Sequence, residues 1–216
     1  MILRYENNLI LFIKEAELKR LLFDRGSYLY PYVNFLVLSG TKIDWKALIT
    51  NYNDFPKKGV IFRDVNPLFR NSTAVQLISK QFIHKEELSK IDYIAGIESR
   101  GFTVASLLAK NFNKGMILVR KVGKLPGKTV KKKYNIEYAS SIIEIQENAI
   151  KKGESILIAD DLIATGGTAI ATAELIEEMG GTVFGFAVII ELVYLKGAEI
   201  LRNKGYDVRS LVKYYD

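Results

Sequence analysis

Cysteine is absent from the 216-residue sequence and histidine occurs once, and both facts exclude kinds of chemistry. A chain without cysteine has no disulfide, no thiolate metal site and no cysteine nucleophile, which favours a cytoplasmic location. A single histidine, His84, cannot form a zinc site or a histidine-based proton relay, and we expect it at the surface. The aromatic-rich apolar run at residues 28–38 is too short to cross a bilayer, and the first residues do not resemble a signal peptide, so we expect no membrane role.

The rest of the composition is that of a globular chain with one main domain. Hydrophobic residues make up 49% and charged residues 25%, which is enough apolar material for one good core. We expect residues 43–216 to form this domain and residues 1–42 to be an extension of unassigned role. In the extension, the pattern predicts an amphipathic helix from Leu9 to Leu22 and a strand over residues 28–38. In the main domain, apolar residues at helical spacing predict a helix over residues 72–88. The net charge of +7 favours anionic partners, either nucleic acid or a pyrophosphorylated sugar.

One stretch, residues 155–181, combines a strand, a glycine turn and a helix. The apolar run at 156–159 predicts a buried strand, and apolar residues at helical spacing over 170–179 predict a helix that two glycines end. The first amides of such a helix have no internal partners and its dipole favours negative charge, so the turn predicts a phosphate site. The residues of this turn are Ala164, Thr165, Gly166, Gly167 and Thr168.

Two acids lie directly before this turn. Asp160 and Asp161 are poor neighbours for a phosphate, but they accept hydrogen bonds from a sugar diol or from water around Mg²⁺. The turn lacks the lysine of a Walker A sequence and the spacing of a dinucleotide fingerprint. Acids followed by an anion site therefore predict a ribose 5-phosphate as the ligand.

This stretch resembles the phosphoribosyl pyrophosphate (PRPP) signature of type I phosphoribosyltransferases, in which two acids and Thr-Gly-Gly-Thr hold the ribose hydroxyls and the 5-phosphate. A second segment, DFPKKGVIFRDVNPLF at residues 54–69, resembles the hood over the base in adenine phosphoribosyltransferases. The resemblance implies that Ile61 offers backbone groups to adenine and that Arg63 helps to shape the pocket. It also implies that Phe62 and Leu162 sandwich the purine ring.

Two loops resemble the part of the family's site that handles pyrophosphate. DYIAGIESRGF contains Ser99 and Arg100, and the resemblance implies that the arginine contacts the leaving group. A non-proline cis peptide is expected at this turn, as in the fold family. An arginine beside a helix start favours an anion on physical grounds too. RKVGKLPG, at residues 120–127, places Lys124 where the family has its pyrophosphate lysine.

The segment from Tyr134 to Ser141 resembles the family's mobile catalytic loop, Tyr-x-Leu-Glu-Tyr-Gly-x-Asp. Glu137 and Tyr138 match this pattern. The resemblance implies that Glu137 is a proton acceptor or a partner of purine N7, and that Tyr138 helps to close the loop. Ile136, Ala139 and Ser141 depart from the pattern. Residues 123–133 have the composition of a lid, and we interpret the lysines at 131–133 as a solvated loop face. ELVYLKG, at residues 191–197, is a further match.

The resemblance covers residues 43–215 and implies an α/β fold of the type I phosphoribosyltransferase kind, a central parallel sheet flanked by helices with a small hood. It implies the conversion of adenine and PRPP to AMP and pyrophosphate, with Mg²⁺ held mainly by PRPP, in a homodimer. One alternative is the same fold acting on hypoxanthine, xanthine or orotate, and the hood sequence argues against it. The other is a PRPP-sensing regulator that binds nucleic acid, which need not keep residues for stabilising a leaving group.

Overall fold

The structure is a computed structural model that describes residues 2–5, 9–12, 43–136 and 139–216. The chain forms two compact units, Met1–Ile43 and Asp44–Asp216. In the first unit, strand β1 (Ile2–Tyr5) pairs antiparallel with β2 (Leu9–Phe12). The helix predicted from Leu9 is therefore wrong over its first four residues, because a short apolar run does not distinguish helix from strand. The rest of that helix and the strand expected at 28–38 lie outside the described residues.

The second unit is built on a seven-stranded sheet with the order β11-β10-β9-β5-β6-β8-β7. The five strands from β11 to β6 are parallel, as predicted, whereas β8 and β7 run antiparallel at one edge. The strands are β5 (Tyr93–Ile97), β6 (Gly115–Lys121), β7 (Thr129–Ile136), β8 (Ala139–Gln146), β9 (Ser155–Ile163), β10 (Thr182–Leu192) and β11 (Val208–Tyr214).

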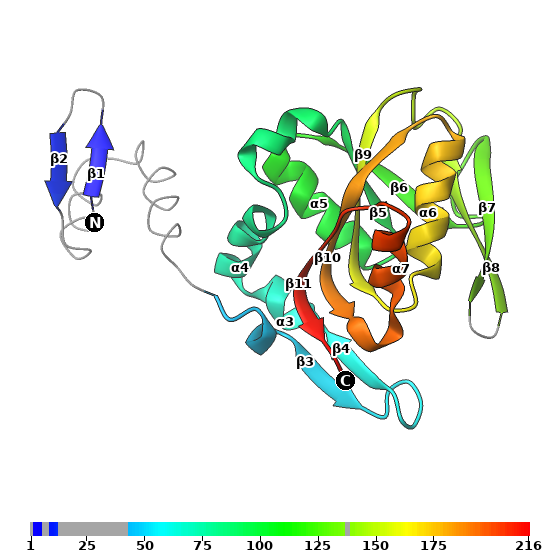
Figure 1. Ribbon diagram of the computed structural model, residues 1–216, viewed down its shortest axis with the longest axis horizontal. Coiled ribbons are helices and arrows are strands. Elements are labelled where there is room, and N and C mark those ends of the chain that lie inside the picture. Colours follow the sequence, from blue (N-terminus) through cyan, green and yellow to red (C-terminus); the bar gives the residue numbers. More distant parts are fainter. Residues whose placement is uncertain (1, 6–8, 13–42, 137–138) are drawn as a thin grey trace. The chain divides into compact units, whose positions relative to one another are not determined.

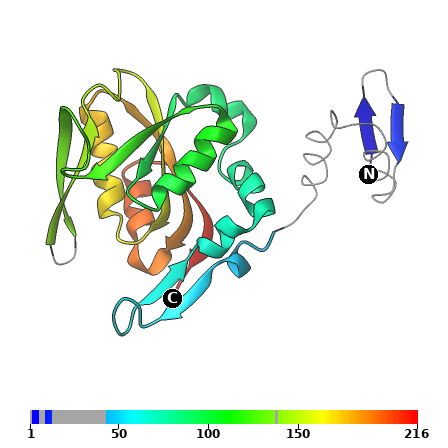
Figure 2. The same cartoon turned by 180° about the vertical axis from the view of Figure 1, so that it is seen from behind.

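Helices cover both faces of the sheet (Figures 1 and 2). Helix α5 (Gly101–Phe112) connects β5 to β6, and α6 (Gly167–Glu178) connects β9 to β10. These two crossovers leave the middle of the sheet in opposite directions, so right-handed connections place the two helices on opposite faces. Helix α7 (Gly197–Asn203) packs beside α6. The change of direction between β5 and β9 is the place where sheets of this kind bind ligands, at the carboxyl ends of the strands.

The core lies between the sheet and these helices. Strand β10 is buried on both faces from Phe186 to Ile190, as its continuous apolar run predicts, and the 156–159 run of β9 is buried as well. Helix α6 adds buried Leu175 and Ile176 to the same cluster. The burial holds the ends of β5 and β9 rigidly at the edge where the polar residues begin.

A small antiparallel hairpin, β3 (Thr50–Asn53) and β4 (Ile61–Asp64), forms the predicted hood segment. The chain between it and β5 is a series of short helices rather than the single helix predicted over 72–88. Arg209 interrupts that helix, since its guanidinium donates hydrogen bonds to the Phe82 carbonyl and to the Glu87 carboxylate. The short helices between the hairpin and β5 are α3 (Asn66–Arg70), α4 (Ser72–Leu77), η3 (Ile78–Gln81) and η4 (Lys85–Lys90). Helix η2 (Lys46–Leu48) precedes the hairpin, and η5 (Val193–Leu195) follows β10.

Two other expectations are settled by the fold. His84 is exposed at the start of η4, as predicted. Residues 129–133, the second part of the stretch expected to be a lid, belong instead to strand β7, which with β8 forms a long hairpin beside α6 (Figures 1 and 2). Within the described residues, no helix is both long enough and apolar enough to cross a membrane.

Candidate active site

The turn from β9 into α6 has the geometry of an anion site. Gly166 has φ of +83°, a conformation that glycine adopts without strain, and α6 begins at the next residue. The first hydrogen bond across this start is donated by the amide of Ile170 to the Gly166 carbonyl, at 2.8 Å. The amides of residues 167–169 therefore have no partner inside the helix and are available to phosphate oxygens. Thr165 is exposed, and Ala164, Gly167 and Thr168 are half-buried.

Gly197, at the start of α7, packs against the backbone of this turn. Its amide donates to the Ala164 carbonyl at 3.0 Å. A Cβ atom at Gly197 would overlap the Ala164 carbonyl oxygen and the Gly166 amide nitrogen, so only glycine allows the two backbones to touch. The sequence showed the ELVYLKG match but assigned it no role; the close backbone approach is visible only in three dimensions.

The two acids at the end of β9 lie in a protected, mutually coupled arrangement. Asp160 Oδ1 accepts the Asp161 amide at 2.8 Å, and Asp161 is only 5% exposed. Burial, and then the charge of Asp161, raises the pKa of Asp160 well above its ordinary value. Burial also raises the pKa of Asp161, against the opposing charge of Arg100. Burial disfavours the ionised form of both acids. Hydrogen bonds from a ligand's hydroxyl groups or from metal-bound water would therefore stabilise their carboxylates.

Arg100 joins the neighbouring strand end to these acids. Its Nε lies 2.9 Å from Asp161 Oδ2, and its guanidinium carbon lies 5.0 Å from the centre of the Phe62 ring. The preceding peptide bond, between Glu98 and Ser99, is cis, as expected, and Ser99 is exposed. Gly101 lets this turn approach β9, because a Cβ there would lie 2.7 Å from Asp160 Oδ1. The ends of β5 and β9 thus form one site.

Lys124 lies in the same region, held by a carboxylate. Its Nζ is 3.2 Å from Glu98 Oε1, and Arg120 Nε is 3.3 Å from Glu98 Oε2. The Lys121 amide also donates to Glu98, at 2.9 Å. These partners outweigh the effect of burial and lower the pKa of Glu98 to about 2. A cluster of basic groups is therefore gathered beside Arg100 by one ionised acid.

A second buried carboxylate, which sequence reasoning missed, fixes the Lys124 loop from the other side. Glu144 on β8 is 2% exposed, and its Oε1 accepts the amides of Lys124 and Leu125 at 2.9 and 3.0 Å. Its Oε2 accepts the Thr129 hydroxyl at 3.1 Å. These donors lower the pKa of Glu144 despite burial. An acid within the apolar run IIEI was the only sequence signal of this role.

The predicted base-binding residues lie in the hood and at the end of β9. Phe62 is half-buried and packs edge-on against Phe55, with ring centroids 5.2 Å apart, while Ile61 is 39% exposed. Leu162 is half-buried. Arg63 is 6% exposed and is directed to the last strand: its guanidinium carbon lies 4.0 Å from the centre of the Tyr214 ring and Nη2 donates to the Asp216 carbonyl.

Two predicted residues, Glu137 and Tyr138, lie outside the described residues, and their roles stay predictions. In the part of the chain that the structure describes, no three histidine, cysteine or acidic side chains are grouped as a metal site would require. Lys132, which we interpreted as part of a solvated face, instead pairs with Glu174 and Glu178 of α6.

A phosphate turn, an acid pair and an arginine meeting at the switch between β5 and β9, with a hood hairpin alongside, define a type I phosphoribosyltransferase. Residues 70–213 match the family model described as "Phosphoribosyl transferase domain". The adenine phosphoribosyltransferase of Nitrosopumilus maritimus is 51% identical over 166 residues, which are 77% of this chain and 96% of that protein. The chain belongs to the adenine phosphoribosyltransferase family.

Solved structures of the family agree with this assignment. The enzyme from Saccharomyces cerevisiae, complexed with D-2,5-dideoxy-2,5-imino-altritol 1,6-bisphosphate and adenine, matches with a TM-score of 0.73 and 40% identity over 78% of this chain and 97% of that chain. The adenine phosphoribosyltransferase from Rhodothermus marinus matches with a TM-score of 0.74 and 36% identity over 84% of this chain and 100% of that chain. The fold predicted from the sequence is confirmed.

Proposed function

We propose that the unit Asp44–Asp216 transfers the phosphoribosyl group of PRPP to N9 of adenine, releasing pyrophosphate and forming AMP for purine salvage. The observation that carries this proposal is the position of Arg100, which lies 2.9 Å from an acid of the PRPP motif and 5.0 Å from the centre of the Phe62 ring of the hood. One side chain thus connects the parts proposed for ribose, pyrophosphate and base. The family relationship, including a yeast relative solved with adenine, supports the choice of base.

The proposed roles follow from what each part offers. The amides and hydroxyls of residues 164–168 bind the 5-phosphate, and Asp160 and Asp161 accept hydrogen bonds from the ribose hydroxyls. Arg100, Ser99 and Lys124 meet the pyrophosphate, whose charge would displace Arg100 from Asp161 and Lys124 from Glu98.

The base is proposed to bind between the hood and the end of β9. Ile61 offers backbone groups, and a fixed amide pairs with adenine but mispairs with a 6-oxo purine. Phe62 and Leu162 enclose the ring, and Arg63 supports the pocket through its contact with Tyr214. Glu137 is proposed as the proton acceptor or N7 partner and Tyr138 as a closing residue.

The chemistry needs no protein nucleophile. The anomeric carbon gains oxocarbenium character as pyrophosphate leaves, and N9 forms the new bond and loses its proton, so the protein contributes positioning and charge stabilisation. Mg²⁺, when bound with PRPP, would shield the pyrophosphate charge. Asp160 and Asp161 fit contact through its water molecules, because two buried acids with raised pKa are too few for direct coordination but suited to accept hydrogen bonds.

The proposal includes a homodimer, a cytoplasmic location and an extension at residues 1–42 of unassigned role. Leu118, in the middle of β6, and Val122, just beyond its end, are 41% and 42% exposed, and exposed apolar side chains favour contact with a second copy. Light scattering on the purified protein tests this directly: a mass of one chain, about 24 kDa from the 24.4 kDa sequence, would contradict the dimer. The cytoplasmic location stays a prediction from composition.

The test of function is pyrophosphate release from PRPP and Mg²⁺, with adenine, hypoxanthine, guanine, xanthine and orotate each offered separately. We expect turnover with adenine, and faster turnover with another base would replace it as the substrate. The second candidate, a regulator that senses PRPP and binds nucleic acid, is favoured only by the +7 charge. PRPP binding without turnover of any base, together with nucleic-acid binding that weakens steeply with salt, would support it.

A further inference from the structure

We propose that Tyr134 is a positioning residue for the 5-phosphate, acting through the hydroxyl of Thr168. This inference rests on the proposed function, since it assigns a further residue to the same site. The carrying observation is a hydrogen bond between the Thr168 hydroxyl and the Tyr134 hydroxyl, at 3.1 Å, which links strand β7 to the first turn of α6. No part of the PRPP motif itself predicts a partner on this strand.

Strand β7 presents one face to α6 along its length. Its residues alternate in exposure, with Lys131 and Lys133 exposed and Val130, Lys132 and Tyr134 half-buried. Lys132 pairs with Glu174 and Glu178 in the second half of α6. Two residues further along the same face, Tyr134 reaches the beginning of the helix, so the strand is fastened to the helix at two places.

The position of the Tyr134 hydroxyl is fixed by packing. Its ring lies against the main hydrophobic cluster, as does Val130 on the same face. The backbone of Thr168 is held as well, because its carbonyl accepts a hydrogen bond from the hydroxyl of the fully buried Thr172 at 2.8 Å. Both partners therefore stay in place when the hydroxyl hydrogens reorient.

A threonine hydroxyl has one hydrogen to donate and two lone pairs to accept with. In the structure, the Thr168 hydroxyl donates to the Tyr134 hydroxyl. When Thr168 donates to phosphate instead, the Tyr134 hydroxyl can turn and donate a hydrogen bond to the Thr168 oxygen. The resulting chain, from tyrosine to threonine to phosphate, keeps the threonine in the rotamer that meets the phosphate. It also strengthens the hydrogen bond from Thr168 to the phosphate, because consecutive hydrogen bonds polarise one another. Removing the tyrosine hydroxyl should weaken phosphate binding without changing the base pocket.

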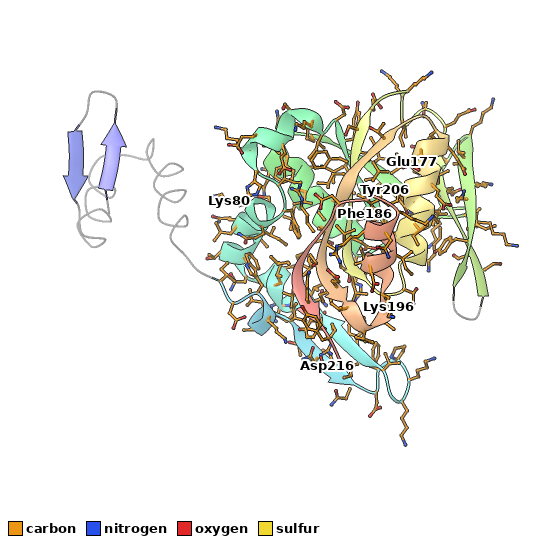
Figure 3. All side chains as sticks on the ribbon, viewed as in Figure 1. Lys80, Glu177, Phe186, Lys196, Tyr206 and Asp216 are labelled. Atoms are coloured by element: carbon orange, nitrogen blue, oxygen red, sulfur yellow. The ribbon has the colours of Figure 1, made fainter. Side chains whose placement is uncertain are left out.

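The experiment compares Tyr134→Phe with wild type and with Tyr206→Phe. Tyr206 is a matched control because its hydroxyl also donates to α6, at 2.9 Å to Glu177, and its ring packs on Phe186 far along the helix from the turn (Figure 3). Calorimetry would measure the Kd of ribose 5-phosphate and of AMP, and initial rates would give KM for PRPP and for adenine. Thermal melting would report any general loss of stability.

We expect Tyr134→Phe to raise the Kd of ribose 5-phosphate and of AMP, and KM for PRPP, by about fivefold, the effect of one hydrogen bond. KM for adenine should stay unchanged, and Tyr206→Phe should leave all four constants unchanged. On a Thr168→Val background, Tyr134→Phe should have no further effect, because the chain is already broken.

Three results would overturn the inference. These are unchanged ribose 5-phosphate affinity in Tyr134→Phe, an equal loss in Tyr206→Phe, and full additivity with Thr168→Val. Failure of the proposed function is recognised separately, since it would appear as absent adenine turnover in wild type while the ribose 5-phosphate measurement still decides the role of Tyr134. Wild-type protein that binds no ribose 5-phosphate would contradict both.

Discussion

Arg100 and Asp161 form an ion pair across two strand ends, with Nε 2.9 Å from Oδ2, although the acid is nearly buried and the arginine is 43% exposed. The pair joins the pyrophosphate loop to the PRPP motif. Because the guanidinium is partly exposed, we expect an incoming anion to draw it away from Asp161, which leaves the buried acid free to accept sugar hydroxyls. In the proposed function, the ion pair joins the two strand ends and releases both groups when the substrate replaces it.

Asp161→Ala should therefore abolish useful turnover without unfolding the chain. We expect kcat/KM for PRPP to fall by about 100-fold or more, as when a transition-state contact is removed. Circular dichroism should show an unchanged fold, since the variant also removes a buried acid whose pKa is raised. Wild-type activity in this variant would disprove the assignment of Asp161 to the ribose diol.

Asp160→Asn should stabilise the protein at neutral pH while lowering its activity. The pKa of Asp160 is raised above 3.8 in the folded chain, so the folded state holds this proton more tightly than the unfolded state. The contribution of Asp160 to the free energy of unfolding is therefore greatest at low pH. This contribution falls as the pH rises above 3.8 towards the pKa of the folded state. Asparagine keeps an oxygen for the Asp161 amide but cannot ionise.

We expect the variant to gain about 1 kcal/mol or more at pH 7, the value of one pKa unit. Chemical unfolding at pH 5 and pH 7 would measure this gain, which should be smaller at pH 5. A variant less stable than wild type at pH 7 would show that Asp160 is stabilised as an anion, contrary to the direction of its pKa.

Gly197→Ala tests whether the phosphate turn depends on its backbone support. The added Cβ would overlap Ala164 and Gly166, and shifting the turn by about 1 Å should cost on the order of 100-fold in kcat/KM. Gly115→Ala is the steric control: its Cβ would meet only the Tyr93 ring, at 2.9 Å, which can move. Equal activity losses in the two variants would mean that general destabilisation, rather than the turn, is responsible.

Glu144→Ala tests the buried support of the Lys124 loop. The change leaves two backbone amides and one hydroxyl without their acceptor, so we expect KM for PRPP to rise about tenfold while KM for adenine stays the same. Glu87→Ala is a control for losing an acid with a strong partner, because Glu87 pairs with Arg209 and with no residue proposed for the site. An unchanged KM for PRPP in Glu144→Ala would remove the positioning role.

The structure shows why some elements were predictable and others were not. The run 156–159 and the glycines after it specify a buried strand and a helix start by local rules alone, and the structure confirms β9 and α6. The helix predicted over 72–88 is wrong because a distant arginine, Arg209, binds the chain at Phe82 and Glu87. Local periodicity contains no information about such a partner.

The sequence by itself determined the fold class and the family, and it predicted the phosphate turn and the acid pair, because each depends on residue types at fixed spacing. Only the tertiary structure decided what supports them. Gly197 lies beneath the turn, Glu144 behind Lys124 and Tyr134 beside Thr168, each from an element far along the chain. These relationships depend on which strands become neighbours in the sheet, and that order is set by the packing of the whole domain.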